Sequence, residues 1–131
     1  MQQAVNPMCV MERQWGKSPM VMFTDSAECI GVLARDSGKD QIIGILLSMY
    51  DDDGEELFSS DDVGTVVDIL AANGYDASSV ILVGAISSWT KMLEPALYAL
   101  MSALKPVDTQ ELPDGTYGAK IDSNGNIQVL R

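Results

Sequence analysis

Cys29 is the residue of this chain whose type and position best suit chemistry. It lies between a turn of small and acidic residues, 24–28, and an apolar run. A thiol at the start of a strand can act as a nucleophile beside backbone N–H groups that stabilise an oxyanion. The chain contains no histidine, so no Cys–His pair can activate this thiol. The alternative is that Cys29 is a small buried hydrophobic residue, the usual role of cysteine in a strand.

Two carboxylates in the adjoining turn, Asp25 and Glu28, also bear on the reactivity of Cys29. Negative charge near a thiol disfavours the thiolate and raises the thiol pKa. The local sequence therefore favours an unreactive cysteine.

The acidic run of residues 51–56 is the second segment whose composition suggests chemistry. An EF-hand loop with Gly54 as its sixth residue needs oxygen ligands at Met49 and Ser60, and Met49 offers none. We therefore expect a solvated turn, with a weak cation site of another type as the alternative. The sequence has no Cys/His cluster for zinc and no phosphate-binding glycine loop, so we expect neither a metal nor a cofactor.

Short apolar runs between turn residues predict buried strands over 20–23, 29–34 and 42–49. The residues before them, 1–18, have no clear periodicity and end in the breaker cluster 16–19. We expect this segment to be an N-terminal arm or loop.

The second half of the chain predicts helices alternating with strands. Ser60 is the expected N-cap of a helix that ends at Asn73 and Gly74. A second helix is expected from near Ser88 to about 104, with Pro95 causing a later start or a kink. Further strands are predicted over 80–85, 106–109, 117–121 and 127–130, and Asn124-Gly125 indicates a hairpin between the last two.

This order of elements predicts one domain of the α/β (α+β) class over residues 19–131. Strands, helix, strand, helix and strands do not form a regular βαβ repeat. We therefore expect a mixed β-sheet sandwich with helices packed on it. The length and the hydrophobic fraction of 47% are those of a single domain with an ordinary core.

The net charge of −11 limits the partners that this chain can bind. Such a field repels nucleic acid and anionic membranes, and it favours a protein partner with a basic surface, or solubility alone. The apolar runs are too short to insert into a bilayer. No secretory leader is visible, and two cysteines are too few for a disulfide framework, so we expect a cytoplasmic protein.

The ordered set of segments resembles a known family. The run 24–36, Thr-Asp-Ser-Ala-Glu-Cys-Ile-Gly-Val-Leu-Ala-Arg-Asp, is similar to the opening of CheD, the chemoreceptor glutamine deamidase. The strand Ile42–Leu47, the helix over 61–74, the strand over 80–85, the helix over 92–104 and the terminal hairpin follow in the family's order. The likeness covers roughly residues 19–131. The fold also occurs in the catalytic domain of cytotoxic necrotizing factor.

The resemblance implies a candidate site. It places the nucleophile at Cys29 and the active-site threonine at Thr24, although the spacing to Cys29 is one residue short. The family's histidine falls near Leu47 or Ser48, and neither side chain is a useful base near neutral pH. In the family the imidazole takes the thiol proton, and the thiolate then attacks a glutamine side-chain amide.

Three functions follow from these observations. The first is a CheD-like protein that has lost catalysis and binds a protein, such as a receptor or regulator. The second is an active cysteine-dependent glutamine deamidase or amidase whose base is Asp25 or a group from a partner. The third is an acidic secretion chaperone, a class that normally dimerises and begins with a long helix.

Overall fold

The computed structural model describes residues 1–50 and 58–131, without the side chain of Asp25. The acidic run 51–56, for which the sequence favours a solvated turn, lies outside the described residues. The described part of the chain forms nine strands in two sheets together with three α-helices. This confirms the α+β class predicted from the order of the elements.

The larger sheet has six strands, and β4 (Ile30–Arg35) lies near its middle. Both neighbours of β4 run antiparallel to it, whereas the strand at each edge runs parallel to the strand beside it. In spatial order the other strands are β1 (Gln2–Gln3), β2 (Gln14–Ser18) and β5 (Ile42–Leu47) on one side, and β6 (Ile81–Gly84) and β7 (Asp108–Glu111) on the other.

The smaller sheet has three antiparallel strands, β3 (Met20–Ser26), β8 (Gly115–Ile121) and β9 (Ile127–Leu130). The predicted hairpin is confirmed, because β8 pairs with β9 and the intervening Gly125 has a φ of +77°. A glycine adopts this left-handed conformation without steric cost. The pairing of β3 with β8 joins segments that lie far apart in the sequence.

The helical elements begin and end close to the predicted residues. A 3₁₀ turn (Ser60–Asp62) leads into α1 (Val63–Ala72), but the N-cap is Ser59 rather than Ser60, and Asp62 completes a capping box with it. The second predicted helix is two helices, α2 (Ile86–Met92) and α3 (Glu94–Leu104), because Pro95 occupies the first turn of α3. A further 3₁₀ turn, Ala77–Ser79, precedes β6.

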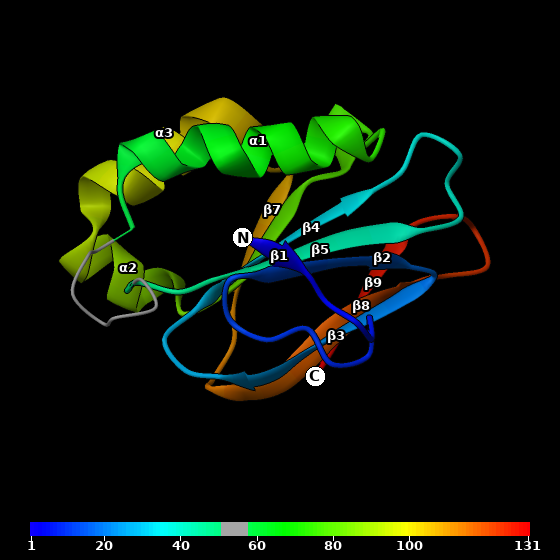
Figure 1. The fold of residues 1–131 in the computed structure, drawn as a ribbon, viewed down its shortest axis with the longest axis horizontal. Coiled ribbons are helices and arrows are strands. Elements are labelled where there is room, and N and C mark those ends of the chain that lie inside the picture. Colours follow the sequence, from blue (N-terminus) through cyan, green and yellow to red (C-terminus); the bar gives the residue numbers. More distant parts are fainter. Residues whose placement is uncertain (51–57) are drawn as a thin grey trace.

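The elements stack in three layers, with the helices on one face of the larger sheet and the smaller sheet on the other (Figure 1). Alternation along β4 explains why the larger sheet has two buried faces. Ile30 and Val32 belong to the core beneath the helices, whereas Leu33 belongs to the core between the sheets. No helix in the described ranges is long and apolar enough to cross a membrane.

Residues 1–18 do not form the arm or loop expected from the sequence. Within this segment Gln14–Ser18 pairs with β5 along its whole length, and Val10 forms a bridge with Phe23 of the smaller sheet. Val10 is fully buried. The segment therefore contributes to both sheets, and the lack of periodicity reflects a strand of mixed, half-buried residues.

Candidate functional site

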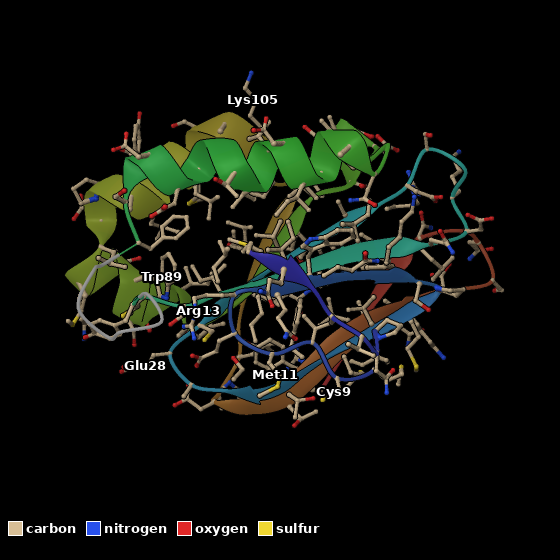
Figure 2. The ribbon with its side chains drawn as sticks, in the orientation of Figure 1. Cys9, Met11, Arg13, Glu28, Trp89 and Lys105 are labelled. Atoms are coloured by element: carbon tan, nitrogen blue, oxygen red, sulfur yellow. The ribbon has the colours of Figure 1, made fainter. Side chains whose placement is uncertain are left out.

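Cys29 lies in the turn between β3 and β4, and contacts from three directions fix this turn. The Ala85 N–H donates to the carbonyl oxygen of Cys29 at 2.9 Å, and the indole N–H of Trp89 donates to the carbonyl oxygen of Glu28 at 2.8 Å. The Glu28 N–H donates to a carboxylate oxygen of Asp114 at 2.9 Å. Glu28 has a φ of +54°, an uncommon conformation for this residue type that these bonds hold in place. Figure 2 labels Glu28 and Trp89 on the side of the molecule where α2 begins.

Gly84 allows the backbone of β6 to approach this turn. Its φ is +116°, which side-chain-bearing residues rarely adopt. A Cβ at this position would collide with the Cys29 carbonyl group and would lie 2.7 Å from the Tyr117 hydroxyl oxygen. The site is therefore packed around a residue that must be glycine.

The thiol of Cys29 is buried and faces a carboxylate. The residue is 1% exposed, and Sγ lies 3.3 Å from Oε1 of Glu12 and 3.3 Å from the carbonyl oxygen of Ala27. Glu12 also forms an ion pair with Arg13, with an Nη1–Oε2 distance of 3.5 Å. The thiol can donate its proton to either acceptor, so the observed geometry suits the neutral form of Cys29.

The electrostatics of the site oppose the thiolate. Burial, the negative charge of Glu12 and the hydrogen bond to that carboxylate raise the pKa of Cys29 from 9.0 to about 12. Hydrogen bonds with the Ala27 backbone and then with the Ser26 side chain lower this pKa, but their effects are smaller. Burial also raises the pKa of Tyr117, so both groups are protonated at neutral pH.

A pair of hydroxyl groups completes the cluster. Ser26 Oγ and Tyr117 Oη are 2.7 Å apart, and both residues are buried. Tyr117 also packs edge-on against Phe23. A shift in the β3–β8 register between Phe23 and Ser26 accompanies the position of Ser26 opposite the start of β8. We name Glu12, Ser26, Cys29 and Tyr117 the thiol cluster.

The other candidate residues take different positions. Thr24 is half-buried on β3, and its N–H donates to the carbonyl oxygen of Val10 at 3.0 Å. Thr24 lies in the part of β3 where the pairing with β8 is irregular, and the Cys29 thiol donates to Glu12 and Ala27 instead. The side chain of Asp25, the alternative base, lies outside the described residues.

Ser48 is half-buried just after β5, and its hydroxyl oxygen accepts a hydrogen bond from the Tyr50 N–H at 3.3 Å. The last pair of the β4–β5 ladder is Ile30 with Leu47. Continuing this antiparallel register by one residue brings Ser48 level with Cys29.

Sequence reasoning missed three members of the thiol cluster. Glu12 belongs to the segment expected to be an arm, and only the path of that segment across the smaller sheet brings it to Cys29. Tyr117 was expected on a strand, but its hydrogen-bond partner, Ser26 of β3, is distant in the sequence. Ser26, in the turn before Cys29, was the member that the sequence could have indicated.

The thiol cluster contains the groups of a proton-transfer site, but the group facing the thiol is a negatively charged carboxylate and not the neutral imidazole of a Cys–His pair. A carboxylate in contact with a thiol can accept its proton, and two hydroxyl groups can donate hydrogen bonds to a developing charge. In the part of the chain that the structure describes, no group of three or more Cys, Asp and Glu residues could hold a metal ion. No known family model matches the chain, and no curated protein matches it.

Proposed function

We propose that this chain is a catalytically silent, CheD-like protein that acts by binding a protein partner with a basic surface. The observation that carries this proposal is the burial of the Cys29 thiol against the Glu12 carboxylate. A nucleophile needs the opposite arrangement, an accessible sulfur next to a positive or neutral base.

The raised pKa of Cys29 leaves very little thiolate at neutral pH. With a pKa of about 12, roughly one thiol in 10⁵ is ionised at pH 7. Catalysis by cysteine depends on the thiolate, so this fraction multiplies directly into the rate. The sequence has no histidine that could move into the site and change this balance.

The register around Cys29 supports the CheD-like part of the proposal. The resemblance predicts that the residue in the place of the family's histidine lies near Leu47 or Ser48. Continuing the β4–β5 register one residue beyond its last pair, Ile30 with Leu47, would bring Ser48 level with Cys29. With serine in the place of the family's histidine, the chain keeps the surrounding strands but lacks the base.

The contact between Cys29 and Glu12 favours one second candidate, an active thiol enzyme in which Glu12 is the base. The distance of 3.3 Å between Cys29 Sγ and Glu12 Oε1 is short enough for proton transfer. Because Cys29 is 1% exposed, a substrate would reach sulfur only after the segment that carries Glu12 moved away. That movement would also separate the base from the thiol, so we favour the silent protein.

A combined binding and turnover experiment tests the proposed function. The purified chain is titrated calorimetrically with the cytoplasmic domain of a bacterial chemoreceptor, and ammonia release is measured in the same mixtures. We expect binding without ammonia release above that of the Cys29→Ala variant. Ammonia release that depends on Cys29 would refute the proposal, and the absence of binding would exclude a chemoreceptor as the partner.

Alkylation by iodoacetamide separates the two candidates more directly. The exposed Cys9 must first be replaced by serine so that only Cys29 reacts. We expect slow alkylation at pH 7, a rate that rises only as the pH approaches 12, and a lower midpoint in Glu12→Gln. A midpoint below that of an ordinary cysteine in the Cys9→Ser protein would instead favour the enzyme.

A further inference from the structure

The side-chain amides of the four asparagines differ in their access to the backbone nitrogen of the next residue. An asparagine loses its amide spontaneously when that nitrogen attacks Cγ, which requires a backbone N–H and room for the approach. Asn6 precedes Pro7, whose nitrogen carries no hydrogen. Asn126 precedes the β-branched Ile127, which crowds the nitrogen, and Oδ1 of Asn126 accepts a hydrogen bond from Arg35 at 3.3 Å. These two asparagines are therefore protected.

The other two asparagines both precede glycine, which has no side chain to hinder the attack. Both glycine N–H groups donate to a turn carbonyl, Gly74 at 3.1 Å and Gly125 at 3.0 Å, so this bond does not distinguish them. Asn73 is half-buried at the end of α1, where Nδ2 donates to the carbonyl oxygen of Ile69 at 2.8 Å. Asn124 is exposed, and among the described residues its side chain has no hydrogen-bond partner. Only Asn124 thus combines an unhindered nitrogen with a side chain that is free to turn toward it.

We propose that Asn124 is a site of spontaneous deamidation at the tip of the β8–β9 hairpin. The tip projects from one end of the molecule, and exposed turns are the parts of a fold that open most readily (Figure 1). Once the Gly125 N–H leaves the Asp122 carbonyl oxygen, the nitrogen attacks Cγ of Asn124 and closes a succinimide ring. The Cγ–Nδ2 bond breaks, and ammonia leaves with the proton from Gly125. Water then opens the ring at either carbonyl carbon and leaves aspartate or isoaspartate.

The two products should affect the hairpin differently. Isoaspartate at position 124 routes the main chain through the former side chain, which lengthens the backbone just before Gly125. The carbonyl oxygen of Gly125 accepts a hydrogen bond from Arg35 Nη1 at 2.8 Å. We expect the longer backbone to shift this oxygen and weaken its bond to Arg35. Aspartate keeps the original backbone and adds only a negative charge to an exposed turn.

Ageing of the purified full chain at mildly alkaline pH tests the site. Peptide mapping by mass spectrometry follows all four asparagines in one sample, because each conversion replaces an amino group with a hydroxyl group. Asn124 should convert at least roughly fivefold faster than Asn73, the factor that one intramolecular hydrogen bond is worth. Asn6 and Asn126 should stay unchanged over the same period.

The same experiment in urea separates the effect of the fold from that of the local sequence. In the unfolded chain the hydrogen bond between Asn73 and Ile69 is absent, so Asn73 and Asn124 should convert at similar rates. Equal rates of the two in the folded chain, or the same difference in urea as in the folded chain, would overturn the proposal. Neither result bears on the proposed function, because that function rests on the thiol cluster.

The stability of the products tests the link to Arg35. The isoaspartate form, separated by chromatography, should unfold at a lower urea concentration than the unaged chain. The matched variant Asn124→Asp should unfold close to the wild-type midpoint, because it carries the added charge on an unchanged backbone. An isoaspartate form as stable as Asn124→Asp would overturn the link to Arg35.

Discussion

The two ends of β4 hold polar groups in opposite ways. At its start, Cys29 places a buried neutral thiol against the carboxylate of Glu12. At its end, Arg35 forms an ion pair with Asp76 at 2.8 Å and donates to the carbonyl oxygen of Gly125, also at 2.8 Å. The Arg35 end is therefore a clamp of opposite charges. At the Cys29 end, in contrast, the carboxylate of Glu12 faces a neutral thiol in place of a positive charge.

The difference separates a structural ion pair from the candidate site along one strand. The Arg35 side chain is 14% exposed and connects the larger sheet to the β8–β9 hairpin and to the segment before β6. Hydrogen bonds from Ser78 and then from Arg35 lower the pKa of Asp76. Glu12 raises the pKa of Cys29 instead. Strongly perturbed pKa values occur at functional sites and also in structural ion-pair networks, and the two ends of β4 carry one perturbed group each.

Gly84→Ala should disrupt the packing at the Cys29 end of β4 and should cause the largest loss of stability. The new Cβ would collide with the Cys29 carbonyl group in a backbone conformation that alanine avoids. We expect a loss of about 3 kcal/mol or more in the free energy of unfolding, measured by urea denaturation. The control is Gly64→Ala on α1, where a Cβ meets nothing within 4 Å and should add about 0.5–1 kcal/mol. Equal effects of the two changes would contradict the close approach at Gly84.

Arg35→Met should disrupt the contacts at the opposite end of β4 and should cause the next largest loss of stability. The change keeps an apolar stem but leaves Asp76 and the hairpin carbonyl without their charged donor. We expect a loss of about 2–4 kcal/mol in the free energy of unfolding. Arg131→Met serves as the control, because Arg131 is exposed and should change stability by less than about 0.5 kcal/mol. A comparably small loss for Arg35→Met would show that this end is not a clamp.

Alkaline titration should sharpen the comparison, because Cys29 loses a proton at high pH whereas the guanidinium of Arg35 stays charged. The pKa of Cys29 is about 12 in the folded chain and near 9.0 in the unfolded chain. Between these values the unfolded chain binds fewer protons, so the free energy of unfolding falls as the pH rises through this window. Cys29→Ala should make the fall shallower in urea unfolding between pH 8 and about 11. Tyr117 acts in the same direction, so some decline remains in that variant.

The smallest effect is expected for the hydroxyl pair of the thiol cluster. Tyr117→Phe leaves the buried Ser26 hydroxyl without its 2.7 Å partner and should cost about 1–2 kcal/mol. Adding Ser26→Ala should cost less in the Tyr117→Phe background than in the wild type. A double-mutant cycle measures this coupling, which we expect to be about 1 kcal/mol. Strict additivity would mean that the hydroxyl groups do not act as a pair.

The sequence predicted the elements better than their edges and junctions. Turn residues and apolar runs located the strands, and Asn124-Gly125 located the hairpin, because these signals are local. Gln14–Ser18 escaped prediction because four of its five residues are half-buried and its sequence has no apolar pattern. The break at Leu93 was anticipated only as a later helix start or a kink, because the proline rule does not distinguish these from two separate helices.

The candidate site was predictable at one residue and not in its surroundings. Cys29 is conspicuous by type and position, but its exposure and pKa depend on Glu12 and Tyr117, which are distant in sequence. Sequence reasoning named the adjacent carboxylates of Asp25 and Glu28 as the charges that oppose the thiolate. The charge that does so in the described structure is that of Glu12, which reaches Cys29 through the tertiary fold.

The pairing of β3 with β8 has a consequence for how the protein is made. Met20 pairs with Lys120, so about 100 residues of synthesis separate the two strands. At roughly 5–20 residues per second a ribosome needs about 5–20 seconds to cover that interval. Throughout this delay β3 presents an unpaired edge, with Val21 and Phe23 lacking the cover that they have in the finished fold. Until β8 has been made, the nascent chain therefore exposes a strand edge that can template aggregation, and a chaperone that shields β3 would act in that interval.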